Sequence, residues 1–232
     1  MAAGAHDVLL IGAGMAGLAA ANSLASSGLR VLLLEAQHHI GGRVLTRRIG
    51  DQVIELGAEF VHGRPPELWS LIEEAGLAVR EREGTRLSFH DGALHTDGEI
   101  DDTFEPLADL KNFDGPDLSF AEYLNRKPLP PEQRGALIGY IEGFNAADHR
   151  QISTASLAVQ QQAEDAVDGD RLYHVVGGYD QLAHYLAGRI TARRGSIRLG
   201  ERAREIRWRS GRVTVLTGND SFTAPQAVIA VP

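Results

Sequence analysis

The chain has 232 residues, a formal net charge of −8 and no cysteine. The acidic balance argues against a nucleic acid or an anionic membrane as partner, and the missing cysteines exclude disulfides, thiolate metal sites and cysteine-linked cofactors. No apolar stretch approaches a membrane span, and the N-terminus lacks the pattern of a signal peptide, so we expect a cytoplasmic protein without a metal site.

The first predicted elements are a strand, a glycine-rich turn and a helix. Val8–Ile11 is a short apolar run suited to a buried parallel strand, and Met15–Ser27 has apolar residues at helical spacing. Between and within them, Gly12 permits a tight turn, Gly14 lets a pyrophosphate approach the backbone, and Gly17 lets the helix pack closely on the strand. The free N–H groups at the start of such a helix favour negatively charged phosphates.

The next strand ends at an acidic residue. Val31–Leu34 is apolar, and Glu35 follows it, 18 residues past Gly17, close to the spacing of a ribose-binding acid. A carboxylate at this position repels a 2′-phosphate, which disfavours NADP. The agreement of strand, glycines, helix, strand and acid predicts a dinucleotide-binding fold, rather than a glycine turn in an ordinary α/β protein.

A second glycine pair, Gly41-Gly42, precedes Arg43. A guanidinium can hold a phosphate with two hydrogen bonds, and the two glycines let the backbone pass close to a bulky ligand. An NAD dehydrogenase has no general need for this second element, so the pattern favours FAD. The alternative is a surface arginine after a flexible turn.

The remaining elements alternate between a mainly helical middle and a return to strands. Asp91-Gly92 and Ser210-Gly211 are hairpin turn signals. We predict helices from Pro66 to Gly76, over 118–124, 132–144, 153–163 with Ser153 as its cap, and after Gly177-Gly178 as far as Ile190. We predict strands at 85–90, 93–96, 197–199, 205–209 and 212–217, and a last buried strand at 228–231.

At this point the chain resembles the flavin-containing amine oxidase family, which includes monoamine, polyamine and L-amino acid oxidases. The resemblance is carried by Gly12–Gly17, Glu35-Ala36, Gly41–Arg43 and Glu55–Gly63, with a weaker match over Val176–Leu182 and the strands up to Pro232. It is thin between about residues 80 and 170. It implies an α/β fold, a Rossmann-like FAD-binding domain (1–75 and 172–232) with an inserted, mainly helical substrate-domain portion (76–171).

The resemblance also implies the site. The residues it places at FAD are Gly12, Ala13, Gly14, Met15, Ala16, Gly17, Glu35, Ala36, Gly42, Arg43, Gly57, Ala58, Glu59, Phe60 and Ala203, the last touching adenine through its backbone. Glu59 and His62 are candidates for substrate contact, because a carboxylate attracts a cationic amine and histidine titrates near neutral pH. The alternatives are a solvated Glu59 whose backbone alone meets the flavin, which we favour somewhat, and a His62 that is merely a satisfied core or surface residue.

The implied reaction is hydride removal from the amine-bearing carbon of a small amine or amino acid, hydrolysis of the imine, and reoxidation by O2 to give H2O2. Members of the family continue past the point matching Pro232, into a catalytic lysine and a segment that closes over the flavin; neither Lys111 nor Lys127 has a matching context. We therefore expect a missing C-terminal half or a second polypeptide. The alternatives are a non-catalytic nucleotide-binding module and a flavin desaturase or protoporphyrinogen-oxidase-like enzyme.

Overall fold

The computed structural model describes residues 6–84, 87–90, 92–96, 103–218 and 220–232. The chain forms two compact units. The first unit contains residues 1–61, 66–80 and 173–232, and the second contains residues 62–65 and 81–172. The chain therefore passes from the first unit into the second after residue 80 and returns after residue 172. The sequence predicted these boundaries after residues 75 and 171. No helix among the described residues has both the length and the apolar character needed to cross a membrane.

The first unit is built on a parallel sheet of four strands. Its strands are β1 (Val8–Ile11), β2 (Val31–Leu34), β10 (Ser196–Arg198) and β14 (Gln226–Ile229), in the order β10-β2-β1-β14. All three neighbouring pairs run parallel. This sheet confirms the predicted α/β class, and β1 and β2 occupy the residues that the apolar runs indicated.

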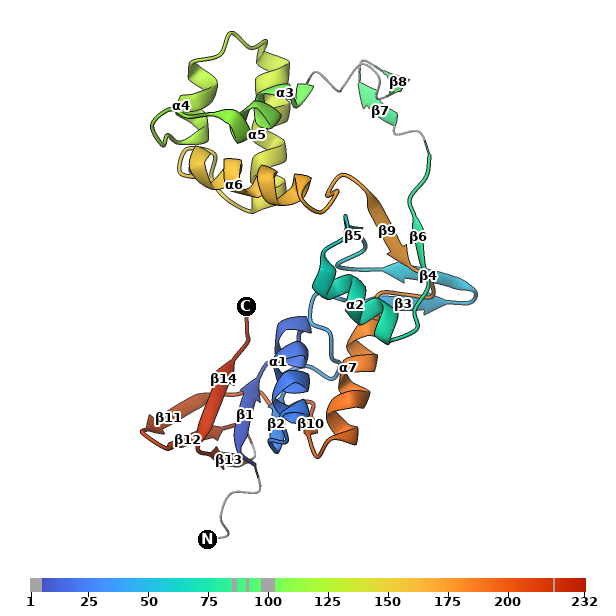
Figure 1. Cartoon of the computed structure of the whole chain (residues 1–232), viewed down its shortest axis with the longest axis vertical. Coiled ribbons are helices and arrows are strands. Elements are labelled where there is room, and N and C mark those ends of the chain that lie inside the picture. Colours follow the sequence, from blue (N-terminus) through green and yellow to red (C-terminus); the bar gives the residue numbers. More distant parts are fainter. Residues whose placement is uncertain (1–5, 85–86, 91, 97–102, 219) are drawn as a thin grey trace. The chain divides into compact units, whose positions relative to one another are not determined.

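One face of the sheet is covered by two helices, α1 (Met15–Ser26) and α7 (Asp180–Ala192) (Figure 1). Leu10 and Leu33 point to this face and pack with Leu18 of α1 and residues of α7 in one buried cluster. Successive residues of a strand point to opposite faces. Both faces of β1 must therefore be covered for the whole strand to be buried, as it is.

The opposite face is covered by an antiparallel meander of β11 (Glu205–Arg209), β12 (Arg212–Leu216) and β13 (Ser221–Ala224). Leu9 and Leu32 pack there against Val215 of β12. Figure 1 shows the meander and the helix pair on either side of β1. Coverage on both faces explains why the sequence of β1 and β2 is continuously apolar rather than alternating.

The last strand differs from the prediction. The sequence pattern predicted a buried strand over 228–231, but β14 ends at Ile229, with Val228 37% and Ile229 62% exposed. In the described part of the chain β14 lies at the edge of the sheet, with β1 as its neighbour on one side. Apolar character alone indicated burial, whereas the position of the strand in the sheet decides it.

Two further sheets are smaller than the parallel sheet. β3 (Thr46–Ile49) and β4 (Gln52–Glu55) form a hairpin that the sequence reading missed. A further sheet has the order β5-β9-β6, and its bounds are Val61–His62 for β5, Val79–Glu81 for β6 and Leu172–Val175 for β9. Helix α2 (Pro66–Glu74) buries Ile72 in a cluster with Val61, Tyr173 and Leu182.

The second unit is mainly helical, as predicted. Its helices are α3 (Glu105–Ala108), the 3-10 helix η3 (Asp109–Asn112), α4 (Phe120–Asn125), α5 (Pro131–Asn145) and α6 (Thr154–Asp165). Phe120, Leu124, Leu137 and Ile141 are fully buried in their shared core. The predicted cap of α6 is confirmed, because the hydroxyl of Ser153 accepts from the N–H of Ser156 at 3.2 Å.

The predicted hairpin of the second unit consists of β7 (Leu87–His90) and β8 (Ala93–Thr96), which pair antiparallel. Phe89 lies directly opposite Leu94 in this pair. The predicted start of the first strand at Thr85 and the turn residue Asp91 lie outside the described residues.

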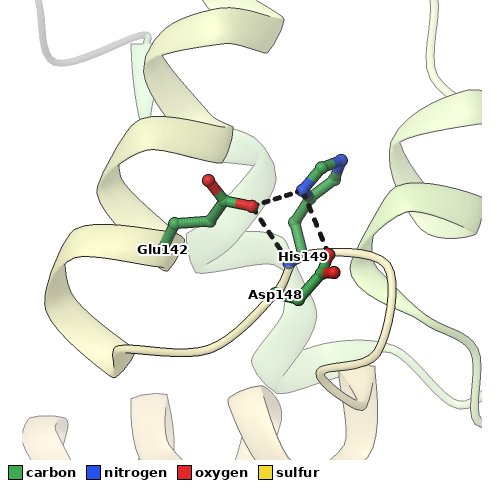
Figure 2. A group of neighbouring side chains, drawn as sticks. All are labelled: Glu142, Asp148 and His149. Carbon is green, nitrogen blue, oxygen red and sulfur yellow. Dashed lines mark hydrogen bonds and ion pairs between the residues drawn. The ribbon is translucent and has the colours of Figure 1, made fainter.

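The turn after α5 is closed by Glu142, Asp148 and His149 (Figure 2). The Nδ1 atom of His149 lies 2.7 Å from the Glu142 carboxylate and 3.7 Å from that of Asp148. Two ligands of a tetrahedral zinc ion lie about 3.3 Å apart, since each bond is about 2.0 Å. The 2.7 Å separation is instead a hydrogen bond, and hydrogen bonds from Arg150 lower the pKa of Asp148 to about 2. These contacts hold the turn after α5 in place.

Candidate functional site

At the turn between β1 and α1, the start of a helix has no side-chain cap in the described part of the chain. Gly14 is the N-cap residue of α1, and it has no side chain to cap the first N–H groups. Gly12 has a φ of +103°, and a Cβ there would lie 2.5 Å from the carbonyl oxygen of Ala230. Gly17 is buried, and a Cβ there would lie 1.9 Å from the carbonyl oxygen of Gly12. The glycines thus fold the turn so that the helix start faces outward, a geometry that favours phosphate.

Glu35 stands beside this turn at the end of β2. Its Oε2 atom accepts a hydrogen bond from the N–H of Ala13 at 2.6 Å, and its Oε1 atom accepts one from the N–H of Gln37 at 2.8 Å. Each carboxylate oxygen keeps a second lone pair for a ligand hydroxyl. The carboxylate is therefore fixed in place before any ligand binds, which the sequence spacing alone did not show.

Replacing Glu35 with glutamine is expected to weaken dinucleotide binding by about 1–3 kcal/mol, the cost of an unsatisfied polar contact. A carboxamide has one oxygen, so its NH2 group must face either the N–H of Ala13 or that of Gln37. The measurement is the Kd of FAD by fluorescence titration of the purified protein. Glu201→Gln is the matched control, because Glu201 lines the same pocket and its backbone N–H, not its side chain, bonds Glu35. Equal affinities for Glu35→Gln and the parent would contradict the ribose assignment.

The second glycine pair meets the first turn directly. The N–H of Gly41 donates to the carbonyl of Ala13 at 2.8 Å, and Gly14 and Gly41 form a parallel bridge. A Cβ on Gly42 would lie 3.2 Å from the Cα of Gly14. The exposed guanidinium of Arg43 forms no hydrogen bond or ion pair with the residues that the structure describes. The structure therefore places Arg43 in the same pocket wall as the helix start, with its guanidinium available to a ligand.

The segment Gly57-Ala58 lies against the backbone of Arg43. The N–H of Ala58 donates to the carbonyl of Arg43 at 2.8 Å, and a Cβ on Gly57 would lie 1.9 Å from the same oxygen. No side chain larger than hydrogen fits at Gly57. Because of this close approach, the three motifs of the sequence form one continuous surface.

This surface lines a pocket of about 1270 Å³ within the first unit. The predicted residues that line it are Gly12, Gly14, Met15, Ala16, Glu35, Ala36, Gly42, Arg43, Gly57, Ala58 and Ala203. Ala13, Gly17, Glu59 and Phe60 were predicted at the cofactor but are not among the lining residues. Ala13 and Gly17 are buried, and their contacts shape the turn.

The sequence reading missed part of this pocket. Glu201, Arg202 and the residues from Ala230 to Pro232 also line it. The available signal was topological: ligands of open α/β sheets bind outside the carboxyl ends of the strands, and residues 230–232 directly follow β14. A pocket of this size, with a helix start, a fixed carboxylate and a free guanidinium along its wall, suits an extended dinucleotide.

A hydrogen-bond network that the sequence did not reveal anchors the segment before Gly57. The carboxylate of Glu55 accepts from the hydroxyl of Thr46 at 2.6 Å and from the N–H of Tyr179 at 2.8 Å. The N–H of Asp180 donates to the Thr46 hydroxyl at 3.1 Å. Hydrogen bonds from Arg48 lower the pKa of Asp180. The hairpin of β3 and β4 is thereby joined to the start of α7.

The two candidates for substrate contact belong to different units. Glu59 belongs to the first unit, where its carboxylate lies 4.0 Å from the Nδ1 atom of His174. The Phe60 ring, next along the chain, meets the His174 ring edge to face. His62 belongs to the second unit, where its ring centroid lies 6.0 Å from that of Phe144. The sequence reading did not single out His174 or Phe144.

Proteins with similar sequences include several that are named as amine oxidases. The profile of the family described as flavin containing amine oxidoreductase matches residues 15–232. Polyamine oxidase 2 of Arabidopsis thaliana is 31% identical over 97% of this chain and 51% of its own length. Pseudooxynicotine dehydrogenase of Pseudomonas sp. is 24% identical over 98% of this chain and 52% of its own length. The chain thus spans about half the length of these relatives.

Solved structures give the same picture. Wild-type putrescine oxidase bound to putrescine superposes with a TM-score of 0.76 at 26% identity, over 98% of this chain and 58% of that one. Cyclohexylamine oxidase from Brevibacterium oxydans IH-35A has a TM-score of 0.78 at 24% identity, over 97% and 58% of the two chains, which shows the shared fold.

Proposed function

Because this chain belongs to the family of flavin-containing amine oxidoreductases, we propose that it is the FAD-binding portion of an amine or L-amino acid oxidase. The observation that carries the proposal is the single pocket wall formed by the helix start, Glu35, Arg43 and Gly57-Ala58. An ordinary glycine turn would explain the helix start. It would not explain why Glu35, Arg43 and Gly57-Ala58 line the same pocket. The cofactor of this family is FAD.

The residues of the pocket fit the parts of FAD. The N–H groups at the start of α1 and the Arg43 guanidinium would hold the pyrophosphate. Glu35 would accept from the ribose hydroxyls, and the backbone at Ala203 would meet the adenine. Gly14 leaves the space in front of the helix start open to a bulky ligand, because a Cβ there would meet no protein atom within 4 Å. Gly42 and Gly57 instead lack the side chain that would clash with the neighbouring motif.

Bound FAD would supply the acceptor for a hydride from the amine-bearing carbon and, after imine release, would pass electrons to O2 to give H2O2. The residues of the chain orient the substrate. The Glu59 carboxylate, whose side chain is 46% exposed, can attract a cationic amine. Relatives named for polyamine and for L-tryptophan oxidation support this substrate class.

The length of the relatives supports a proposed oxidase that is longer than this chain. The curated relatives named above extend to about twice the length that the chain covers. We propose that turnover requires this remainder, either in the same polypeptide or as a partner chain. A putative protoporphyrinogen oxidase from Exiguobacterium shares the fold at 22% identity, which does not favour ring oxidation over amine oxidation.

Replacing Arg43 with alanine is expected to weaken FAD binding by about 1.5–3 kcal/mol, the scale of one charge-assisted hydrogen bond. The Arg43 guanidinium has no hydrogen bond or ion pair with the described residues, so the melting temperature without FAD should stay unchanged. The measurement is an FAD titration followed by flavin fluorescence. Arg47→Ala is the matched control, because Arg47 is an exposed arginine of β3 that does not line this pocket.

The same titration tests the proposed cofactor. The parent protein should bind FAD and show flavin absorption bands, and should bind NAD more weakly. Tight binding of NAD with no flavin bands would overturn the proposal. Equal FAD affinity for Arg43→Ala and Arg47→Ala would show that Arg43 does not touch the pyrophosphate.

A further inference from the structure

His174 is placed beside the carboxylate of Glu59 by the strand that carries it. In β9, Tyr173 and Val175 are buried in the core of the first unit, while His174 lies between them on the more exposed side. Its ring meets the Phe60 ring at a centroid distance of 4.7 Å and an angle of 60°. The two residues that these contacts join to His174, Glu59 and Phe60, come from the segment that follows Gly57-Ala58.

The distance between the His174 imidazole and the Glu59 carboxylate decides how these groups can interact. The Nδ1 atom of His174 lies 4.0 Å from the Glu59 carboxylate, which is within ion-pair range and too long for a direct hydrogen bond. The side chains are 32% and 46% exposed. Neither side chain covers the other, so the Glu59 carboxylate remains accessible to a ligand. At this distance, a charge placed at position 174 would act on the carboxylate electrostatically.

We infer that His174 is a positioning residue that sets the electrostatic attraction of Glu59 for a cationic amine. The inference rests on the proposed function and extends it, because it assigns a role to a residue outside the motifs of the sequence. A positive charge at position 174 competes with the ammonium group of the substrate for the same carboxylate. A neutral side chain leaves the carboxylate to the substrate, and the contact with Phe60 keeps the ring at this distance.

The expected size of the effect follows from the exposure of the pair. Exposed ion pairs contribute little, so a change of charge at this half-exposed position should change the affinity by about two- to fivefold. The change should appear in substrate binding and not in the rate of flavin reduction at saturation, because His174 acts through Glu59 and not on the reacting carbon.

The test is a charge series at position 174 in the complete FAD-loaded enzyme. His174→Lys, His174→Gln and His174→Glu are compared with one another, so that the protonation of histidine does not enter. The probes are putrescine and cyclohexylamine, with 1,4-butanediol and cyclohexanol as neutral analogues. Rapid-mixing experiments give the Kd and the limiting rate of flavin reduction for each amine, and flavin spectral titration gives the Kd of each analogue.

We expect the Kd of the amines to rise about two- to fivefold from the glutamine to the lysine variant, and to fall in the glutamate variant. The limiting rate should stay within about twofold, the neutral analogues should bind all variants alike, and Glu59→Gln should abolish the series. His184→Lys and His184→Gln are matched controls, because His184 of α7 lies 3.8 Å from Asp180 and forms no ion pair with Glu59 in the described part of the chain. They should share one amine Kd.

Two results would overturn the inference while leaving the proposed function intact. One is an amine Kd that is independent of the charge at position 174. The other is a charge dependence that persists in Glu59→Gln or extends to the neutral analogues. If one variant fails to fold, the remaining pair still gives the sign. A parent enzyme whose flavin no amine or L-amino acid reduces would instead overturn the proposed function itself.

Discussion

Gly17→Ala is expected to unfold the first unit, whereas Gly14→Ala is expected to leave it folded and to weaken FAD binding. Alanine normally favours a helix over glycine by about 1 kcal/mol. At Gly17, however, the new Cβ would lie 1.9 Å from the backbone oxygen of Gly12, and the site is buried. Overpacking a core costs about 1–3 kcal/mol when side chains can shift, and a backbone clash at the joint of β1 and α1 costs more. That is a large part of the stability of a typical domain, about 5–15 kcal/mol.

Gly14 is the internal control for this prediction. A Cβ there meets no atom within 4 Å, and the φ of −69° suits any residue. The methyl group would instead occupy the space in front of the helix start. Urea denaturation followed by far-UV circular dichroism, with an FAD titration of each folded variant, separates the two effects. A Gly17→Ala protein as stable as the parent, or a Gly14→Ala protein that unfolds, would contradict this account of the turn.

The chain by itself is expected to give no sustained turnover of amines, even with FAD added. Its pocket holds the groups proposed to bind phosphate and ribose and the short segment proposed to meet the flavin ring, while its relatives extend to about twice the matched length. A partly built site admits water, so the reacting carbon is not held in the geometry that transfer requires. The expected loss is the whole oxidase activity.

The measurement is peroxide release from a panel of amines and L-amino acids, with the chain alone and with the chain joined to the remaining part of the protein. FAD binding by the chain alone, followed in parallel, shows whether the pocket has formed. Sustained, flavin-dependent turnover by the chain alone would show that the remainder is dispensable and that the map of the site is wrong.

The parts of this fold that the sequence predicted are those in which local pattern and tertiary environment agree. β1, β2 and the start of α1 follow from an apolar run, glycines with distinct steric roles, and a periodic helix. In the second unit, prolines and the cap at Ser153 marked helix boundaries well. These signals are local, so each element can be predicted from its own segment of the sequence.

The parts that the sequence did not predict depend on neighbours distant in the chain. The hairpin of β3 and β4 turns at Gly50-Asp51, and its polar strands gave no apolar alternation to recognise. The network of Glu55, Thr46 and Asp180 joins residues more than 120 positions apart. His174 reads as an ordinary strand residue until the structure places Glu59 4.0 Å away. The burial of β14 was predicted wrongly because apolar residues do not reveal an edge position.

The open edge of β14 has a practical consequence for handling the chain. An edge strand presents unpaired N–H and C=O groups that another copy can pair with, and apolar side chains strengthen such pairing. Val228 and Ile229 place apolar surface at this edge. Concentrated preparations of the chain alone should therefore self-associate through strand addition. A lysine in place of Ile229, which is 62% exposed, would oppose this aggregation by charge repulsion without disturbing the core.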